Sequence, residues 1–302
     1  MTVRVRPFAR GLVHAATGEE SSAFDRYAAV ELDLPTATLM ECAGRSAAEV
    51  VQCLYPCGEV VAVVGTGNNG GDALVALRTL AAWGRRVRAL VVAERPQPES
   101  LLHGWNVQVL NDDAPGDAAW EMLAGADVLI DGMLGTGVKG APRTRQERVI
   151  QAVNAADAFV VALDVPSGVD SATGAVPGGA VSADVTIAFG WPKLGTLAGE
   201  GRALRGRLVV VEIGLPPLPD GRFGAALITP AWAALARPRR DLETHKYRVG
   251  TVLVVAGRPG MAGAAVLAAR AALRTGAGLV YVASAPENRV VLQAAAPEAI
   301  FV

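Results

Sequence analysis

The chain has 302 residues, enough for one large domain or two small ones; 51% of them are hydrophobic and 19% are charged. Together with 34 glycines, this composition is typical of an α/β protein with a well-buried sheet. The formal net charge of −1 argues against a nucleic-acid partner and against a charged membrane surface. No apolar run is long enough to span a membrane and no signal-like segment begins the chain, so we expect a cytoplasmic protein.

Two helices are predicted near the N-terminus. The segment that starts at Thr17 fits a capping box, which predicts a helix over about residues 18–30. A second helix is predicted over residues 36–54, with an apolar stripe that includes Leu39 and Met40. Because such a stripe is usually packing, we assign it to the core.

The segment Val60–Asp72, VVAVVGTGNNGGD, joins a strand to a helix through glycines. Val60–Val64 predicts a buried parallel strand, and helical spacing is clear from residue 73 to 82. The glycines match the dinucleotide-binding fingerprint, which is a weak signal alone. Asp72 would repel a pyrophosphate lying on the helix N-terminus, which disfavours the ordinary NAD-binding role. The two adjacent asparagines exceed what turn chemistry needs.

The rest of the first two-thirds of the chain alternates between strands and helices. Strands are predicted at about residues 87–93, 107–110, 127–134, 159–165, 185–191 and 208–213, and helices at about 117–125 and 144–156. A Pro-rich turn is predicted at residues 95–98. The pattern predicts a Rossmann-like, three-layer α/β/α fold with a mainly parallel sheet.

Polar side chains follow three of the predicted strands. They are Asn68, Asn69 and Asp72 after the first, Asp131 and the loop 135–141 after the fourth, and Asp164 and Ser167 after the fifth. Each alone has an ordinary structural interpretation, such as a turn acid, a Pro–Gly turn or a solvated lysine. Because ligands bind at the carboxyl ends of parallel strands, their joint placement favours a functional site. Carboxamide, carboxylate and hydroxyl oxygens without His or Cys suit a hard cation better than zinc.

The motifs GTGNNGGD, DGMLGTGVKGAPR and LDVPSGVDSATG, in this order, resemble the NAD(P)H-hydrate epimerase family, or YjeF N-terminal domain family. The resemblance covers about residues 17–215, since AFDRYAAVELDLPTATLMECAG is similar to the family's N-terminal helices. It implies an isomerase that interconverts the R and S forms of hydrated NADH and NADPH, here NAD(P)HX. These damaged cofactors carry a hydroxyl on C6 of the nicotinamide ring.

The same resemblance implies the residues of the site. It implies a substrate held by Asn68, Asn69, Gly70, Gly71, Asp72, Gly135, Thr136, Gly137, Val138, Lys139, Gly140, Ala141 and Asp164. It also implies a potassium ion bound by Asn69, Asp131 and Ser167, and Asp164 as the catalytic residue. One carboxylate can both protonate a departing hydroxyl and later deprotonate water.

Two positions depart from the family's usual pattern. Ala73 stands where the family usually has Gly, and Gly132 stands where it usually has Ala. Neither change removes a polar group. A substrate lying directly on the turn would be crowded by Ala73.

Beyond Gly214 the pattern changes. Prolines and glycine mark residues 216–244 as a linker between an epimerase domain at 1–215 and a further segment at 245–302. In that segment, HKYRVGTVLVVAGRPGMAGAAVLAARAALRTGAGLVYVA resembles the opening of the ADP-dependent NAD(P)H-hydrate dehydratase, a lyase with a ribokinase-like fold. The resemblance implies ADP as a cofactor of a complete dehydratase domain. Because the segment has 58 residues (245 to 302), we expect epimerase activity without ADP-dependent dehydration.

Other functions fit parts of the sequence. A nicotinamide-dependent oxidoreductase would use the same glycines, but Asn68, Asn69 and Asp72 argue against it. A non-catalytic scaffold built on the same domain tends to lose the site acids, which this chain keeps. A P-loop enzyme is excluded because no Gly-Lys-Ser/Thr ending follows the glycines. The sequence leaves open a monomer or a homo-oligomer, and a preference for NADHX or NADPHX.

Overall fold

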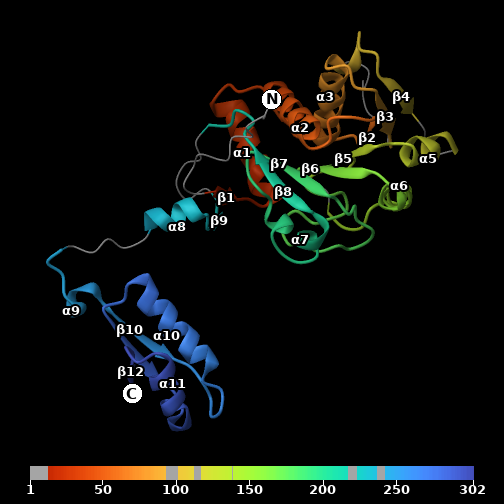
Figure 1. Cartoon of the computed structure of the whole chain (residues 1–302). Coiled ribbons are helices and arrows are strands. Elements are labelled where there is room, and N and C mark those ends of the chain that lie inside the picture. Colours follow the sequence, from red (N-terminus) through yellow and green to blue (C-terminus); the bar gives the residue numbers. More distant parts are fainter. Residues whose placement is uncertain (1–12, 93–100, 112–116, 138, 217–222, 237–241) are drawn as a thin grey trace. The chain divides into compact units, whose positions relative to one another are not determined.

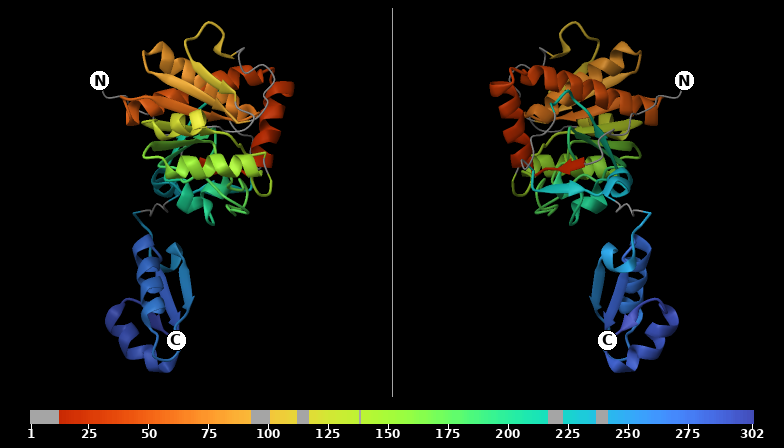
Figure 2. Two further views of the ribbon diagram at one scale, coloured as in Figure 1. Left: turned by 90° about the vertical axis from the view of Figure 1, so that its right-hand side faces the viewer. Right: turned by 90° about the vertical axis from the view of Figure 1, so that its left-hand side faces the viewer.

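The computed structural model describes residues 13–92, 101–111, 117–137, 139–216, 223–236 and 242–302. It divides into two compact units, unit 1 (Met1–Thr229) and unit 2 (Pro230–Val302) (Figures 1 and 2). In the described part of the chain, no helix has the length and apolar character needed to cross a membrane. The turn predicted at residues 95–98 lies outside the described residues.

Unit 1 is built on a sheet whose described strands all run parallel, in the order β4-β3-β2-β5-β6-β7-β8. They are β2 (Val60–Val64), β3 (Val87–Val91), β4 (Gln108–Asn111), β5 (Val128–Gly132), β6 (Phe159–Leu163), β7 (Val185–Phe189) and β8 (Arg207–Val211). These are the strands predicted from the sequence, within a few residues at each end. The chain moves outward from β2 in one direction and from β5 in the other, so the strand order reverses between β2 and β5. Ligands of open α/β sheets bind at such a reversal.

Helices cover both faces of this sheet (Figure 1). One face carries α1 (Gly18–Glu31), α2 (Thr36–Leu54) and α3 (Asn68–Ala82), and the other carries α5 (Asp117–Ala124) and α6 (Thr144–Ala155). Alternate residues of β2 belong to the two cores: Val60, Ala62 and Val64 to one, Val61 and Val63 to the other. Burial on both faces is why this strand is an unbroken apolar run. The three-layer α/β/α prediction is confirmed. Short helical turns at Leu194–Thr196 and Gly201–Leu204 (α7) precede β8.

Helix α3 begins earlier than the sequence predicted. The helix was expected from residue 73, but Asn68 is already helical and Gly67 is its N-cap. The amide of Gly71 donates to the carbonyl of Gly67 at 3.3 Å, so the asparagines and glycines form the first turns of the helix rather than a separate turn. Gly65 is needed for packing, because a Cβ there would lie 1.8 Å from the carbonyl oxygen of Met133.

A small antiparallel pair, not predicted from the sequence, ties the two ends of unit 1 together. Strand β1 (Val13–Ala15) pairs with β9 (Ala225–Leu227), which lies in the segment interpreted as a linker. Beside it, the buried ring of Phe223 packs edge-on against Trp191, with centroids 4.9 Å apart. The predicted capping box at Thr17 is confirmed: its hydroxyl accepts from the amide of Glu20 at 3.1 Å, and its amide donates back to the Glu20 carboxylate at 2.7 Å.

Unit 2 is a smaller α/β body. Its parallel sheet has the order β10-β11-β12, from β10 (Thr251–Val255), β11 (Leu279–Ala283) and β12 (Ile300–Phe301). Its helices are α8 (Pro230–Ala236), α9 (Lys246–Val249), α10 (Gly263–Thr275) and α11 (Arg289–Ala295), with a 3₁₀ turn at Pro286–Asn288. The core joins α10 to β11 through Ala265, Ala269, Val280 and Val282. The second α/β region predicted from the sequence is confirmed.

The two departures from the family pattern face each other across α3 and β5. A Cβ placed on Gly132 would lie 2.6 Å from the Cβ of Ala73, closer than two carbon atoms can approach. The methyl group is thus carried by the helix here, and the strand makes room for it. Ala73 is fully buried in this contact, so the expectation that it would crowd a substrate is wrong.

This packing predicts a strong coupling between the two positions. Gly132→Ala should lower the free energy of unfolding by about 1–3 kcal/mol, as overpacking does. Ala73→Gly alone should cost about 1 kcal/mol through helix propensity. The double variant should be more stable than the sum of the two effects by about 1 kcal/mol or more, because the methyl group is only moved. Urea unfolding of the four proteins measures this; strictly additive effects would show that the contact is absent.

Candidate functional site

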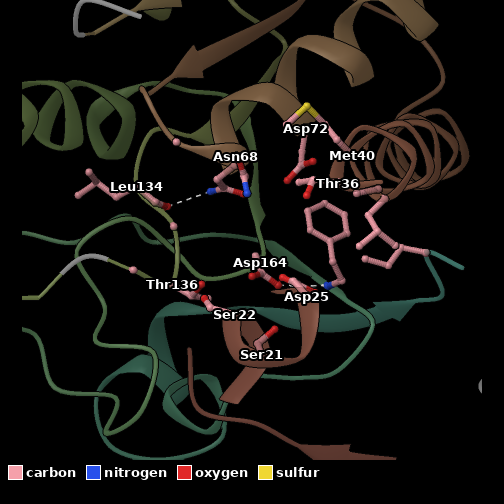
Figure 3. A pocket seen from close by; sticks show the side chains of 18 of the residues that line it. Ser21, Ser22, Asp25, Thr36, Met40, Asn68, Asp72, Leu134, Thr136 and Asp164 are labelled. Atoms are coloured by element: carbon pink, nitrogen blue, oxygen red, sulfur yellow. Dashed lines mark hydrogen bonds between the residues drawn. The ribbon is translucent and has the colours of Figure 1, made fainter. Parts of the chain in front are cut away.

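A cavity of about 420 Å³ lies at the carboxyl edge of the sheet, where the strand order reverses (Figure 3). Its volume is in the range of small-molecule sites. Its walls come from α1, α2, the start of α3, the loop after β5 and the segments after β6 and β7. Of the residues singled out from the sequence, it brings together Asn68, Asn69, Asp72, Gly135, Thr136, Gly137 and Asp164.

The other predicted substrate residues do not line this cavity. Gly70 and Gly71 are buried within α3. Further along the loop, Lys139 pairs with Glu19 at 2.5 Å, and both side chains are exposed. Gly140 borders a smaller pocket and Ala141 is on the surface. Val138 lies outside the described residues.

The side chain of Asn69 ties three strand ends together. Its Nδ2 donates to the carbonyl oxygen of Leu134 at 2.9 Å and to that of Leu163 at 3.1 Å. These two acceptors fix the orientation of the amide, since the opposite orientation would set three oxygens against one another. Its Oδ1 is buried and has no hydrogen-bond partner within the described chain. A buried acceptor without a donor is costly unless another group, such as a cation, meets it.

Asp131 and Ser167 form a buried pair beside this amide. The Ser167 hydroxyl donates to Asp131 Oδ1 at 2.6 Å, and the Ser167 amide donates to Oδ2 at 2.7 Å. The same hydroxyl accepts from the amide of Leu134 at 2.8 Å, which places it next to Asn69. Burial raises the pKa of Asp131, and the hydrogen bonds from Ser167 and Met133 oppose that rise.

Two of the three residues expected to hold potassium, Asn69 and Ser167, bond the backbone of Leu134, and the third, Asp131, bonds Ser167. They offer an unpaired carboxamide oxygen, a buried carboxylate whose described partners are neutral donors, and a hydroxyl. Oxygen donors with a buried negative charge are the chemistry that a hard monovalent cation needs. The donor set fits the ion.

Asp164 sits in an unusual backbone conformation at the end of β6. Its φ of 66° lies in the left-handed region, which is sparsely populated by residues other than glycine. Its amide donates to the carbonyl oxygen of Ile187 at 2.7 Å. Its Oδ1 accepts from the amide of Phe189 at 3.2 Å and from the ammonium group of Lys193. Strain held in place by several bonds is typical of functional positions.

Sequence reasoning missed the other walls of the cavity. Lys193 is 1% exposed and also donates to the carbonyl oxygen of Phe189 at 3.1 Å. Asp25 enters from α1, and Met40, which we assigned to the core with its stripe, lines the cavity from α2. Lys193 could have been found, because it is a charged residue just beyond an apolar strand. Asp25 carried no such signal, since nothing in the sequence says where α1 lies.

Two family models match separate parts of the chain. Residues 36–195 match the family model described as YjeF-related protein N-terminus, and residues 252–302 match that described as NAD(P)H-hydrate dehydratase. Similar proteins include those named bifunctional NAD(P)H-hydrate repair enzyme Nnr in Moorella thermoacetica and Hyperthermus butylicus. The first is 36% identical over 290 residues, 90% of this chain and 54% of that protein. The second is 41% identical over 261 residues, 83% of this chain and 47% of that protein.

The protein of that name in Salinibacter ruber is 39% identical over 297 residues, 90% of this chain and 54% of its own length. The chain thus spans about half the length of these relatives. The crystal structure of the yeast protein ynu0 (YNL200c) has the same fold, with a TM-score of 0.58 and 21% identity over 69% of this chain and 91% of that chain. Because the first family model covers more than half of the 302 residues, the chain belongs to the YjeF-related family through its N-terminal domain.

Proposed function

We propose that unit 1 is an NAD(P)H-hydrate epimerase, which interconverts the R and S forms of NAD(P)HX. The observation that carries the proposal is the cavity at the sheet edge. Three motifs far apart in the sequence meet there, at Asn68, Thr136 and Asp164. The printed name of the similar proteins, NAD(P)H-hydrate repair enzyme, supports the same substrate.

The residues of the cavity suit the reaction. Loss of the C6 hydroxyl leaves a ring cation, stabilised by the lone pair of the ring nitrogen, and water then adds to the other face. Asp164 provides a carboxylate on the cavity wall, held in place by Lys193 and Phe189. Such a group can protonate the departing oxygen and later accept a proton from water. Asn68 and the loop at Thr136 are the groups proposed to orient the substrate.

Potassium is the proposed cofactor, held by Asn69 Oδ1, Asp131 and Ser167. When bound, the ion supplies positive charge that organises these oxygens. Without reference to the ion, Asn69 and Ser167 bond the backbone of Leu134 and so hold the loop after β5 against the start of α3. For unit 2, we propose that it is part of a dehydratase domain, which the match of residues 252–302 supports. ADP is the proposed cofactor of that activity.

Chromatography of a mixture of R and S hydrates tests the epimerase proposal. Starting from one pure form, the protein should produce the other at a rate well above the uncatalysed exchange. A nicotinamide-dependent oxidoreductase would instead change the NADH absorbance in step with a second substrate. With a non-catalytic scaffold, the R and S hydrates would exchange only at the uncatalysed rate, and that result would contradict the proposal.

Asp164→Asn should lower the epimerisation rate by about 10²–10⁴-fold, because it keeps the shape and removes proton transfer. Asparagine also tolerates the left-handed backbone of this position. A matched control is Asp33→Asn, at an exposed aspartate that also has a positive φ, 51°, and lies away from the cavity. The control should keep the wild-type rate. Equal rates for Asp164→Asn and wild type, both folded by circular dichroism, would exclude proton transfer by this carboxylate.

Potassium should raise the melting temperature of the protein more than choline at equal ionic strength, because it binds only the folded state. A ligand at 100 times its dissociation constant adds about 2.7 kcal/mol to the free energy of unfolding. Asn69→Leu should abolish this increment, whatever its own effect on the melting temperature. Ser171→Ala, a buried residue that bonds the loop at Thr136 instead, should keep it. An unchanged increment in Asn69→Leu would place the ion elsewhere.

A further inference from the structure

Asp25 is a second carboxyl group in the cavity. It projects from α1 toward the region where Asp164 lies (Figure 3), and it is half-buried. Within the described chain its side chain makes no hydrogen bond or ion pair closer than 4 Å, yet the charges of Lys193 and Asp164 both act on it. It is therefore a desolvated acid, and the charges that act on it most strongly are those of Lys193 and Asp164.

Lys193 supplies one positive charge to this pair of carboxyls. Its ammonium group is almost completely buried and bonds Asp164 Oδ1 and the carbonyl oxygen of Phe189. Among the described residues that line the cavity, it is the one lysine, and none of them is an arginine. One ammonium group can balance the charge of one carboxylate, so the charge of the second carboxylate would remain unbalanced in a partly desolvated cavity.

We propose that Asp25, Lys193 and Asp164 form one unit that holds a single exchangeable proton, and that Asp25 keeps this proton available to Asp164. Asp25 thus acts through Asp164, as a positioning residue for the proton. This inference rests on the proposed epimerase function for its role in turnover, but the arrangement of charges does not depend on it.

Electrostatics explains why the unit loses this proton at a higher pH than an ordinary aspartate does. Two carboxylates close together cannot both ionise easily, because each charge disfavours the other. Burial raises the pKa of Asp25 to about 6; the charge of Asp164 adds to this rise, while Lys193 and the neighbouring Arg26 oppose it. Asp72, across the same cavity, is a further acidic group. The two protons of such a pair belong to the pair rather than to one residue.

In epimerisation the unit gives up one proton and later takes one back. Asp164 gives the proton to the oxygen on C6, the C6–O bond breaks with both electrons on oxygen, and water leaves. The lone pair of the ring nitrogen stabilises the positive charge that this leaves at C6. When water adds to the other face, C6–O forms again and the released proton returns to the carboxyl pair. Nothing is oxidised or reduced, and no co-reactant is consumed.

Opposite shifts of the pH profile test this unit. In wild type, kcat/KM should fall as rising pH removes the shared proton. Asp25→Asn removes a negative charge, so the proton should be lost at lower pH, and the falling limb should move by about one pH unit or more toward acid. At neutral pH its kcat/KM should be about tenfold or more below wild type. Lys193→Met removes a positive charge and should move the limb toward alkaline pH.

A control and a second measurement keep the outcomes separate. Glu31→Gln, at the exposed end of the same helix, should leave the profile unchanged. Carbon-13 NMR of the side-chain carboxyl should show Asp25 titrating near pH 6 in the ligand-free 302-residue protein. This midpoint should rise in Lys193→Met and fall in Asp164→Asn. An inactive wild type would contradict the epimerase proposal alone. An active wild type with an unshifted profile in Asp25→Asn, or an Asp25 midpoint insensitive to both substitutions, would overturn the shared-proton unit.

Discussion

The amide of Asn69 is the contact on which the arrangement of the site depends. One side chain bonds the carbonyls of Leu134 and Leu163, and so joins the first turn of α3 to the loop after β5 and to the last residue of β6. Strands β2 and β5 are the two neighbours between which the strand order reverses, so Asn69 joins the chain segments that leave the sheet on either side of that reversal. The amide can do this because its nitrogen donates to both backbone carbonyls, while its oxygen stays available to another partner.

The fold could be predicted from the sequence because each strand of the large sheet is a short apolar run bounded by turn residues. Val60–Val64 is buried on both faces, and it was recognisable for that reason. The start of α3 was misjudged because Gly70 and Gly71 have poor helix propensity, while their burial against the sheet overrides it. Strands β1 and β9 are three residues each and pair across more than 200 positions, which leaves no local pattern to detect.

The candidate site was predictable only where chemistry and topology coincide. Asp131 and Asp164 stand at carboxyl ends of strands, and Asn69 begins the helix that follows one, so the rule for parallel sheets brings them to one edge. Asp25 arrives from a helix outside the strand–helix repeat, and its position follows from tertiary packing alone. Likewise, Ala73 and Gly132 are two separate departures from the family pattern in the sequence. In the structure they are in contact, so the methyl group that the strand lacks at Gly132 is replaced by the one that the helix carries at Ala73.

The pairing of β1 with β9 has a consequence for where the functional domain ends. Helix α1 carries Asp25 and follows directly on β1, whose described strand partner is β9. The ring of Phe223 lies against Trp191, which in turn packs against Phe24 of the same helix, with centroids 5.0 Å apart. A polypeptide that stops after β8, the last strand of the large sheet, would keep the three epimerase-like motifs and lose the β1–β9 pair and the Phe223 contact. Its cavity would then have a loosely held wall, so the smallest autonomous form of the domain extends past β9.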